Sequence, residues 1–585
     1  MNPPTNLSTG LLGYLRNYRG RLVAGGILVV AAVAVALAIP FILRYVLDDL
    51  LEGTISGQKL LWYVLAYAVA HLASGGLALC MRRVMFGVGY GVETDLRRDM
   101  FARLTLQDPA FYAGERTGDL MTRMTSDLQS IRELVSLGLL HGWRTIVGIT
   151  LAFVVMFAIN VPITLMMLVW VPTVSIAFFL MLRVLRRRYD ASQEQYSTLS
   201  SFVQESLGGI RTIKGFAIEP LRLKAFDGLN RDYMNLNLAL SRIERLAFPL
   251  MGLCFAFGVA GVLLFGGRQV IQDRMSAGEL VQFSQYLFFL RWPMLALGWT
   301  ATLFQRGAAS WARASKLLEA VPAIRDGDQT DSQLSSVAGA ITFEGVSLHR
   351  EGRALLEHID LVVPEGATVG ITGPTGSGKT LLASMIPRLI EPTLGTVRIG
   401  GRDVREYSLS ALRAHVGMAP QEPFLFSDTL GHNIGFGLGM DEEERVVWAA
   451  DVAQLRPDLE VLPSGLDTVL GERGVTLSGG QRQRTAISRA IAREVPILIL
   501  DDIFSAIDTQ TEALILEQLS KVVLERSCLL ISHRVSTLRH ADFIVVLEGG
   551  RITQQGSHDV LVNQAGYYQE LDEMQRLEAR LEESE

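Results

Sequence analysis

The sequence predicts two structural parts in series, an α-helical membrane domain with six spans and, after it, an α/β domain. The chain has 585 residues, too many for one domain, and 49% of them are apolar, with a mean hydropathy of +0.28. Long apolar runs dominate the part of the chain before residue 305. From Ala340 onward, short β-branched runs alternate with glycine turns and helical stretches, which is typical of an α/β domain around a largely parallel sheet.

Each apolar run of the first part reaches or exceeds the roughly 20 residues that a helix needs to cross a bilayer. The first run follows Arg16, Arg19 and Arg21 and is longer than the apolar core of a signal peptide, so we expect an uncleaved span. The six predicted spans are residues 22–47, 60–81, 134–159, 162–182, 247–271 and 280–304.

The charges between the spans predict their orientation. Arginine and lysine are frequent between spans two and three and between spans four and five, whereas the other loops offer little beyond Lys59 and Arg274. The positive-inside rule therefore places both long segments and both termini in the cytosol. We expect a multi-pass protein of the inner (plasma) membrane, in contact with membrane lipids and with a cytoplasmic α/β domain. The long segments show helical spacing, so we expect helices that continue beyond the bilayer. The net charge of −6 gives no reason to expect nucleic acid as a partner.

The strongest motif lies in the α/β part, where residues 373–380 read Gly-Pro-Thr-Gly-Ser-Gly-Lys-Thr. This stretch fits the P-loop pattern and lies between an expected strand (367–372) and an expected helix (381–389). In such a loop, backbone N–H groups and the helix N-terminus hold the phosphates of a nucleotide. Lys379 adds a positive charge there, and the Thr380 hydroxyl is a Mg²⁺ ligand. The candidate phosphate-binding residues are Gly373, Gly376, Ser377, Gly378, Lys379 and Thr380.

Two later stretches carry complementary chemistry. The apolar run 497–501 ends in Asp501, at the position where a carboxylate can serve Mg²⁺. Residues 477–481 read Leu-Ser-Gly-Gly-Gln and precede an expected helix over 483–493. The N–H groups of such a helix start form a second anion site. Its candidate residues are Ser478, Gly479, Gly480 and Gln481.

The P-loop, the Leu-Ser-Gly-Gly-Gln signature and the strand ending in Asp501, in this order and after six spans, resemble the ATP-binding cassette family. The whole chain is similar to a half-transporter of the type IV exporter architecture. The resemblance implies ATP and Mg²⁺ as cofactors and an ATPase that drives export of a hydrophobic or amphipathic substrate such as a drug, lipid or peptide. Residues 567–585 are expected to form an acidic, solvated surface helix. The chain divides into a cytosolic N-terminal segment, a transmembrane domain, a linker, a nucleotide-binding domain and an acidic tail. The corresponding residues are 1–21, 22–320, 321–339, 340–570 and 571–585.

The resemblance also carries over to individual residues of the site. Gln421 looks like the glutamine of this family that contacts Mg²⁺, and His533 looks like the switch histidine that contacts the γ-phosphate. Arg350 occupies the place where the family usually stacks an aromatic ring on adenine, and the neighbouring His349 is the alternative. Arginine can stack through its guanidinium plane.

Other stretches resemble parts of the family that connect its two domains. Glu472 resembles an acidic contact to the coupling helices, and residues 505–508 resemble the D-loop. Residues 118–123 and 205–214 resemble the two cytoplasmic loop motifs of exporters. We expect helix breaks and coupling helices at these two motifs.

Asp502 is the main departure from the family pattern, which places a glutamate directly after Asp501 to polarise the attacking water. An aspartate arm is shorter by about 1.5 Å on covalent bond lengths. A misplacement of about 1 Å can cost on the order of 10²-fold in rate. We therefore expect the chain's own site to bind ATP and to hydrolyse it poorly, with Asp502 as a weak base.

In the family, two cassettes enclose each ATP between the P-loop of one chain and the signature of the other. An intact signature beside a weakened Asp502 resembles one half of a heterodimeric multidrug or lipid exporter. A second half-transporter with the glutamate is therefore the favoured partner. A homodimer with Asp502 as a slow base, a regulatory subunit that binds ATP without hydrolysis and an importer on the same fold stay open.

Arg144 and Arg291 fall near the middle of their predicted spans, and His71 and His141 also lie within predicted spans. Such residues are costly in a bilayer and usually face a cavity or a partner. They predict either an anionic or amphipathic substrate or ion pairing between chains.

Overall fold

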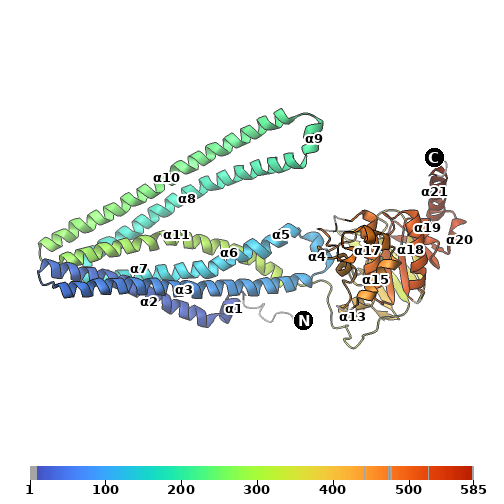
Figure 1. Ribbon diagram of the computed structural model, residues 1–585, viewed down its shortest axis with the longest axis horizontal. Helices are drawn as coiled ribbons and strands as arrows, with labels where there is room; N and C mark the ends of the chain where they lie inside the picture. Colours follow the sequence, from blue (N-terminus) through green and yellow to red (C-terminus); the bar gives the residue numbers. More distant parts are fainter. Residues whose placement is uncertain (1–9, 440–441, 472–473, 475–476, 525, 583–585) are drawn as a thin grey trace. The chain divides into compact units, whose positions relative to one another are not determined.

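The computed structural model describes residues 10–439, 442–471, 474, 477–524 and 526–582. The chain forms two compact units (Figure 1). The first contains the residues up to Leu106 together with Arg116–Ala320, and the second contains Gln107–Glu115 and the residues from Val321 onward.

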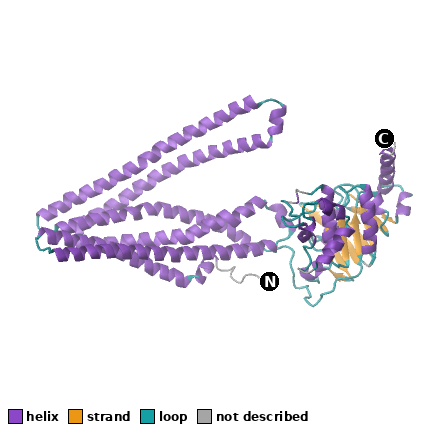
Figure 2. Ribbon diagram, in the orientation of Figure 1, coloured by secondary structure: helices purple, strands orange, loops and turns teal. Residues whose placement is uncertain are grey.

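The first unit is helical throughout (Figure 2). Its helices are α1 (Gly10–Asn17), α2 (Arg19–Leu51), α3 (Gly57–Thr105), α5 (Thr117–Thr122), α6 (Leu128–Glu133), α7 (Leu139–Ile159), α8 (Val161–Gly208), α9 (Ile210–Gly215), α10 (Glu219–Ile271) and α11 (Ala277–Glu319). Single π-helical turns at Arg123–Asp127 and Leu134–Gly138 join α5, α6 and α7 into one continuous helix.

Six helical stretches within the described residues are long and apolar enough to cross a membrane. They are Arg19–Leu51, Gly57–Thr105, Thr117–Ile159, Val161–Gly208, Gly252–Ile271 and Ala277–Glu319. Each contains most or all of one predicted span, so the prediction of six spans is confirmed. The expected continuation beyond the bilayer is also confirmed, because α3, α8 and α10 each run as one helix far past the apolar run. In Figure 1, α8 and α10 form a hairpin closed by α9 and diverge from α7 and α11 toward α9.

The helix breaks follow the prediction at one motif and differ at the other. Gly209 separates α8 from α9 inside the motif 205–214, as expected. The motif 118–123, however, lies within the helix that begins at Thr117, and the expected break there is wrong. The break comes earlier, around the short helix α4 (Pro109–Gly114), whose N-cap Asp108 accepts a hydrogen bond from Phe111 N at 3.0 Å. A proline after an N-cap residue starts a new helix and cannot continue the previous one.

The second unit contains strands among its helices (Figure 2), and its described strands pair into two sheets. A six-stranded sheet has the order β10-β9-β3-β8-β7-β6, in which β10 is antiparallel to β9 and the other neighbours are parallel. A four-stranded antiparallel sheet, which the sequence analysis did not separate from the parallel one, has the order β2-β1-β4-β5. The strands are β1 (Ile341–Arg350), β2 (Arg353–Val363), β3 (Thr368–Thr372), β4 (Leu394–Ile399), β5 (Arg402–Asp403), β6 (Val416–Ala419), β7 (Ile497–Asp501), β8 (Ser527–Ile531), β9 (Phe543–Glu548) and β10 (Arg551–Gly556).

The second unit also contains helices, most of them in the connections between its strands. Besides α4, they are α12 (Lys379–Met385), α13 (Leu409–Ala414), α14 (Leu430–Ile434), α15 (Glu443–Val452), α16 (Arg456–Val461), α17 (Gly479–Ala492), α18 (Thr509–Val522), α19 (Val535–Leu538), α20 (His558–Val562) and α21 (Tyr567–Glu582). Buried side chains of β3, β7 and β8, such as Ile371, Ile499 and Leu529, form part of one core with the antiparallel sheet.

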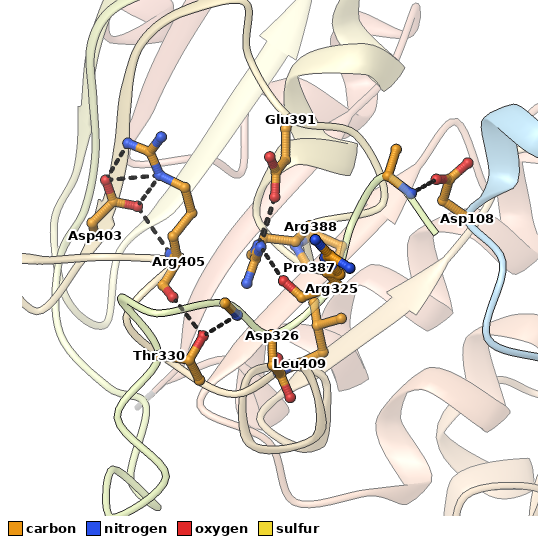
Figure 3. A network of polar contacts seen from close by, with 12 residues as sticks. Asp108, Arg325, Asp326, Thr330, Pro387, Arg388, Glu391, Asp403, Arg405 and Leu409 are labelled. Carbon is orange, nitrogen blue, oxygen red and sulfur yellow. Dashed lines mark hydrogen bonds and ion pairs between the residues drawn. The ribbon is translucent and has the colours of Figure 1, made fainter. Parts of the chain in front are cut away.

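The segment before β1 contains neither helix nor extended strand, yet it packs on the α/β core (Figure 3). Arg388, which is buried, donates from Nη2 to the carbonyl oxygen of Arg325 at 3.2 Å and to Glu391 at 2.6 Å. Asp326 accepts a hydrogen bond from Leu409 N at 2.8 Å. Further contacts join Thr330 to the carbonyl oxygen of Arg405 and Ala323 N to Asp108. The polar stretch predicted as a linker is therefore attached to the α/β unit by several hydrogen bonds.

The parallel order fixes where the motifs meet. Strand β8 lies between β3 and β7, and its last residue, Ile531, pairs in register with Ile371 and Asp501. Because the carboxyl ends of parallel strands lie at one edge of a sheet, the loops after these three strands converge there. These are the P-loop, the Asp501–Asp502 pair and the His533 segment.

Candidate nucleotide-binding site

A cavity of about 340 Å³ lies at this edge of the six-stranded sheet. The side chains and backbone that form it come from the P-loop, the β6 end, the β7 end and the β8 end. Its lining residues are Thr375, Gly376, Gly378, Lys379, Thr380, Leu381, Gln421, Asp501, Asp502, Ile531 and His533. The structure thus brings together residues that are more than 150 positions apart in the sequence.

The P-loop conformation depends on glycine at its first position. Gly373 has φ +142°, and a Cβ atom there would lie 2.0 Å from the carbonyl oxygen of Leu547. No L side chain fits this position without a shift of the backbone. The loop leads into α12, whose N-cap is Gly378, and Ser377 N donates to the carbonyl oxygen of Pro374 at 3.2 Å.

Lys379 is buried at the start of α12 and carries its charge into the loop. Its Nζ atom donates to the carbonyl oxygens of Gly373 at 2.8 Å and Pro374 at 2.9 Å. Burial lowers the pKa of Lys379, while the nearby carboxylates of Asp502 and Asp501 act in the opposite direction. The ammonium group is therefore held inside the loop and faces two carboxylates.

Asp501 is buried, and one of its carboxylate oxygens has no hydrogen-bond partner among the described residues. Burial raises the pKa of its carboxyl group, and the hydrogen bond of the Thr380 hydroxyl partly offsets this. Its Oδ2 atom and the Ser377 Oγ atom are buried and have no hydrogen-bond partner among the described residues. Buried polar atoms are rarely left unpaired unless an ion or ligand completes them. A carboxylate oxygen beside a hydroxyl is the oxygen donor set that Mg²⁺ prefers, so these residues fit that ion.

Asp502 and Gln421 are linked directly across the cavity. The Gln421 Nε2 atom donates to Asp502 Oδ2 at 3.2 Å, and Asp502 N donates to the carbonyl oxygen of Ile531 at 2.9 Å. Asp502 has φ +47°, in the left-handed region that aspartate tolerates better than most residues.

His533 lines the same cavity from the loop after β8. Burial lowers the pKa of its imidazole, and the positive charge of Lys379 acts in the same direction. The neutral form of His533 is therefore favoured around pH 7.

The signature residues lie outside this cavity in their own chain. Ser478 is the N-cap of α17, so the helix begins at Gly479 and the predicted start at 483 is wrong. Ser478 and Gln481 form a capping box, because Ser478 Oγ accepts from Gln481 N at 3.2 Å and Gln481 Oε1 accepts from Ser478 N at 2.8 Å. A Cβ atom on Gly480 would lie 3.0 Å from the carbonyl oxygen of Ala506, so the signature and the expected D-loop are in close contact.

Gln483, which no motif in the sequence marked, joins the start of α17 to the expected D-loop. Its Nε2 atom donates to Ser505 Oγ at 2.7 Å, and its Oε1 atom accepts from Ala506 N at 2.9 Å. A second glutamine so soon after Gln481 is the feature of the sequence that could have drawn attention to Gln483.

The residues expected near adenine lie at the end of a hairpin. Arg350 is the last residue of β1 and pairs with Arg353 of β2, while His349 N donates to Thr393 Oγ1 at 2.9 Å. Neither residue is among those that line the cavity. Glu472, the expected acidic contact, lies outside the described residues.

Comparison with known protein families agrees with this architecture. The family model described as the ABC transporter transmembrane region matches residues 22–294, and the one described as ABC transporter matches residues 356–505. The two matches cover most of the helical unit and the part of the α/β unit that holds the P-loop, the signature and Asp501.

Individual relatives are similar along almost the whole chain. The uncharacterized ABC transporter ATP-binding protein YknU of Bacillus subtilis is 33% identical over 94% of both chains. The multidrug resistance-like ATP-binding protein MdlA of Escherichia coli is 33% identical over 98% of this chain and 97% of its own. The ATP-dependent lipid A-core flippase of Syntrophus aciditrophicus is 30% identical over 98% of this chain and 95% of its own.

A solved structure, of a bacterial Atm1-family ABC exporter with ATP bound, is similar in fold. It aligns with a TM-score of 0.80 at 28% identity and covers 95% of this chain and 99% of that chain. The fold class predicted from the sequence is therefore confirmed, six membrane helices followed by an α/β nucleotide-binding domain. The chain belongs to the ATP-binding cassette transporters and has the type IV exporter fold, in which ATP hydrolysis is coupled to transport across a membrane.

Proposed function

We propose that this chain is one half of a dimeric exporter in the inner (plasma) membrane that moves an anionic amphipathic substrate. Within the chain, residues 22–320 serve transport, 340–570 bind nucleotide in the cytoplasm, 321–339 connect the two, and 1–21 and 571–585 are the terminal segments. The observation that carries the proposal is the cavity that combines Lys379, Thr380, Asp501 and His533. It unites a cation, a hydroxyl, a buried carboxylate and an imidazole at one edge of the sheet.

Each group of the cavity has a proposed role toward ATP. The N–H groups of Gly373, Gly376, Ser377 and Gly378 hold the phosphates, with Lys379 as the neighbouring positive charge. Thr380, Asp501 and Gln421 hold Mg²⁺, which neutralises charge on the phosphate oxygens when it is bound. His533 contacts the γ-phosphate, and Arg350 or His349 stacks on the adenine. Support for the Mg²⁺ ligands comes from the unpaired Oδ2 atom of Asp501.

Asp502 is the proposed weak base of this site. A base must lie within hydrogen-bond reach of the proton that it removes. Its carboxylate is short by one methylene relative to the glutamate of the family, and it already accepts a hydrogen bond from Gln421. Both features keep the carboxylate away from a water that a longer side chain reaches. The chain's own site is therefore expected to bind ATP and turn it over slowly.

The signature residues supply the argument for a second subunit. Ser478, Gly479, Gly480 and Gln481 do not line the cavity of their own chain. In the proposed dimer, the N-terminus of α17 faces the γ-phosphate bound by the partner's P-loop. Because the favoured partner carries the glutamate, hydrolysis occurs mainly at that second site. A homodimer that uses Asp502 as a slow base is the alternative.

The substrate class follows from cations in the first unit. Arg144 lines a small cavity of about 30 Å³ together with Ser74, Met81 and Phe289. Arg291 lies with its guanidinium carbon 5.6 Å from the centroid of the Phe255 ring. Neither arginine forms an ion pair within the described residues.

The two span histidines differ from each other. His141 has a buried Nδ1 atom without a hydrogen-bond partner in the described part of the chain. His71 is exposed, and its Nδ1 atom contacts the carbonyl oxygen of Tyr67 at 3.0 Å. Unpaired cations beside apolar side chains within spans suit an anionic head group with an apolar body. The names of the relatives, multidrug resistance-like and lipid A-core flippase, support an amphipathic substrate.

The test uses the full-length chain in lipid vesicles, alone and together with a candidate second half-transporter. ATPase rate is measured with and without an anionic amphiphile and with a zwitterionic amphiphile of the same chain length. We expect faster turnover in the two-chain preparation and stimulation by the anionic compound alone. Arg144→Gln should reduce that stimulation, whereas Arg187→Gln, beyond the apolar span predicted over 162–182, should not. Absence of ATPase activity in both preparations contradicts the exporter and favours a regulatory subunit.

A further inference from the structure

The helix α21, near the end of the chain, is attached to the loop that carries His533. Tyr568 and Leu571 of α21 are buried in one cluster with Val535 and Leu538 of α19, the short helix that begins two residues after His533. The sequence predicts a solvated acidic helix over residues 567–585, but Leu571 and Asp572 are buried. One face of α21 is therefore part of the domain.

Gln575 of α21 makes two hydrogen bonds to the backbone of this loop. Its Nε2 atom donates to the carbonyl oxygen of His533 at 2.7 Å, and its Oε1 atom accepts from Val535 N at 2.9 Å. A single side-chain amide thus binds a carbonyl and an N–H group on either side of Arg534. Both bonds have good lengths for their atom types. Gln575 and Val535, 40 residues apart, thus join α21 to the backbone that sets the direction of the His533 side chain.

The same loop is held from its other side by α18. Arg534 donates to the carbonyl oxygen of Ile507 at 3.1 Å and forms an ion pair with Glu512, which is buried. Glu512 also accepts hydrogen bonds from Ser536 at 3.2 Å and Thr537 at 2.5 Å. The contacts to Glu512 fix Arg534 and the start of α19, and Gln575 holds the His533 carbonyl itself.

We infer that Gln575 is a positioning residue that keeps His533 directed into the nucleotide cavity, and thereby lets the site distinguish nucleotides with a γ-phosphate from those without one. This inference rests on the proposed role of His533 toward the γ-phosphate. Without the Gln575 side chain, the carbonyl group of His533 loses its hydrogen bond to α21. The peptide bond after His533 can then rotate, and the direction of the imidazole is no longer fixed. Binding of the phosphates by the P-loop should be unchanged, because Lys379 is held within that loop by the carbonyl oxygens of Gly373 and Pro374.

The experiment compares nucleotide affinities at the site of this chain in the full-length transporter. Binding of Mg²⁺–AMP-PNP and of Mg²⁺–ADP is measured by competition against a photoreactive ATP analogue that labels this chain. The variants are Gln575→Ala, Gln575→Glu and His533→Ala. The matched control is Gln569→Ala, because Gln569 lies on the same helix and its side chain donates to Glu573, on that helix, at 3.0 Å.

We expect His533→Ala to weaken AMP-PNP binding about tenfold, the value of one hydrogen bond to a charged group, and to leave ADP binding unchanged. Gln575→Ala should weaken AMP-PNP binding by roughly three- to tenfold, again without a change for ADP. Gln575→Glu should behave like Gln575→Ala, since a carboxylate keeps the bond to Val535 N but cannot donate to the His533 carbonyl. The double variant of His533 and Gln575 should lose no more than His533→Ala, because the two residues act through one contact.

The outcomes distinguish the proposed role of His533 from the inferred role of Gln575. If His533→Ala leaves the ratio of AMP-PNP to ADP affinity unchanged, the proposed role of His533 is wrong. If His533→Ala changes the ratio and both Gln575 variants match Gln569→Ala, the inference about Gln575 is overturned. Equal losses for both nucleotides in the Gln575 variants also overturn it, because they indicate a general effect on the fold of the domain.

Discussion

The P-loop and the signature differ in how far this one chain completes them. At the P-loop, the buried atoms Ser377 Oγ and Asp501 Oδ2 have no hydrogen-bond partner in the described part of the chain. At the signature, Ser478 and Gln481 satisfy each other in a capping box. The first arrangement needs a ligand to complete its polar groups, and the second is already complete. The signature is therefore a stable helix start within this chain alone, and its proposed role opposite a partner's nucleotide has to be tested separately from that of the P-loop.

The largest effect is expected from Ser478→Arg, which tests the signature side. The substitution removes the cap and places bulk and positive charge at the N-terminus of α17, where the helix dipole favours an anion. We expect ATP turnover of the assembled transporter to stop, while nucleotide binding at this chain's own P-loop is unchanged. Steady-state ATPase rate and photolabelling of the chain measure the two properties.

Ser408→Arg is the matched control, because Ser408 caps α13 with the same geometry and its hydroxyl accepts from Ala411 N at 3.2 Å. Loss of an N-cap costs about 1 kcal/mol of stability wherever it occurs. Equal loss of turnover in both variants contradicts the role of the signature opposite a partner's nucleotide.

The next effect concerns the P-loop side. Lys379→Ala removes the buried charge that lies beside Asp501 and Asp502, so we expect nucleotide affinity at this site to fall on the order of 100-fold. Competition binding with ATP on the full-length chain measures it. Lys521→Ala is the control, since that lysine is exposed on α18 and pairs with Glu517 at 3.5 Å. Unchanged binding in Lys379→Ala places the nucleotide elsewhere.

A smaller effect is expected from Asp501→Asn, which keeps the shape of the side chain and removes its charge. Mg²⁺ should then enhance ATP binding about tenfold less than in the unchanged protein. Titration of ATP with and without Mg²⁺ gives this ratio. An unaltered Mg²⁺ effect excludes Asp501 as a ligand.

The same variant should change stability in the absence of Mg²⁺. Burial raises the pKa of Asp501, so the folded protein disfavours the ionised carboxylate at any pH above the usual aspartate range. Asp501→Asn should therefore raise the melting temperature in EDTA at pH 7. The gain should disappear as the pH falls below the ordinary pKa of an aspartate, because the wild-type carboxyl is then protonated in both states.

The sequence allowed the prediction of features that are set locally or by the bilayer. A span needs a minimum length of apolar helix, so six spans could be recognised without a structure. The strand that ends at Asp501 has the predicted bounds because four consecutive apolar residues, two of them β-branched, follow a proline and end at a pair of aspartates. Strand order then explains why Thr380, Gln421, Asp501 and His533 lie around one cavity.

Other features depend on contacts that leave no local pattern. The start of α17 at Gly479 was missed because two glycines favour a turn, whereas the capping box of Ser478 and Gln481 starts a helix there. The separate antiparallel sheet depends on pairing between β1 and β4, which are 44 or more residues apart. Gln575 lies on an acidic helix whose composition resembles a solvated surface, and its contact to His533 spans 42 residues.

The smallest effect is expected at Asp502, and it decides between the two dimers. In a heterodimer, Asp502→Ala should change turnover by less than about threefold, because a carboxylate that is short by about 1.5 Å already contributes little. Replacement of the partner half-transporter's matching glutamate should nearly abolish turnover.

Asp502→Asn serves as the companion variant, since its amide oxygen can still accept the hydrogen bond from Gln421 at 3.2 Å. Agreement between the Ala and Asn variants shows that the Gln421 contact is not needed for turnover. Asp502→Glu should restore only part of a normal site, because φ +47° is less favourable for glutamate than for aspartate. The measurement is steady-state ATPase rate of the chain alone and of the two-chain transporter in one lipid preparation. If the chain alone is active and Asp502→Ala abolishes that activity, the protein is a homodimer in which Asp502 acts as the base.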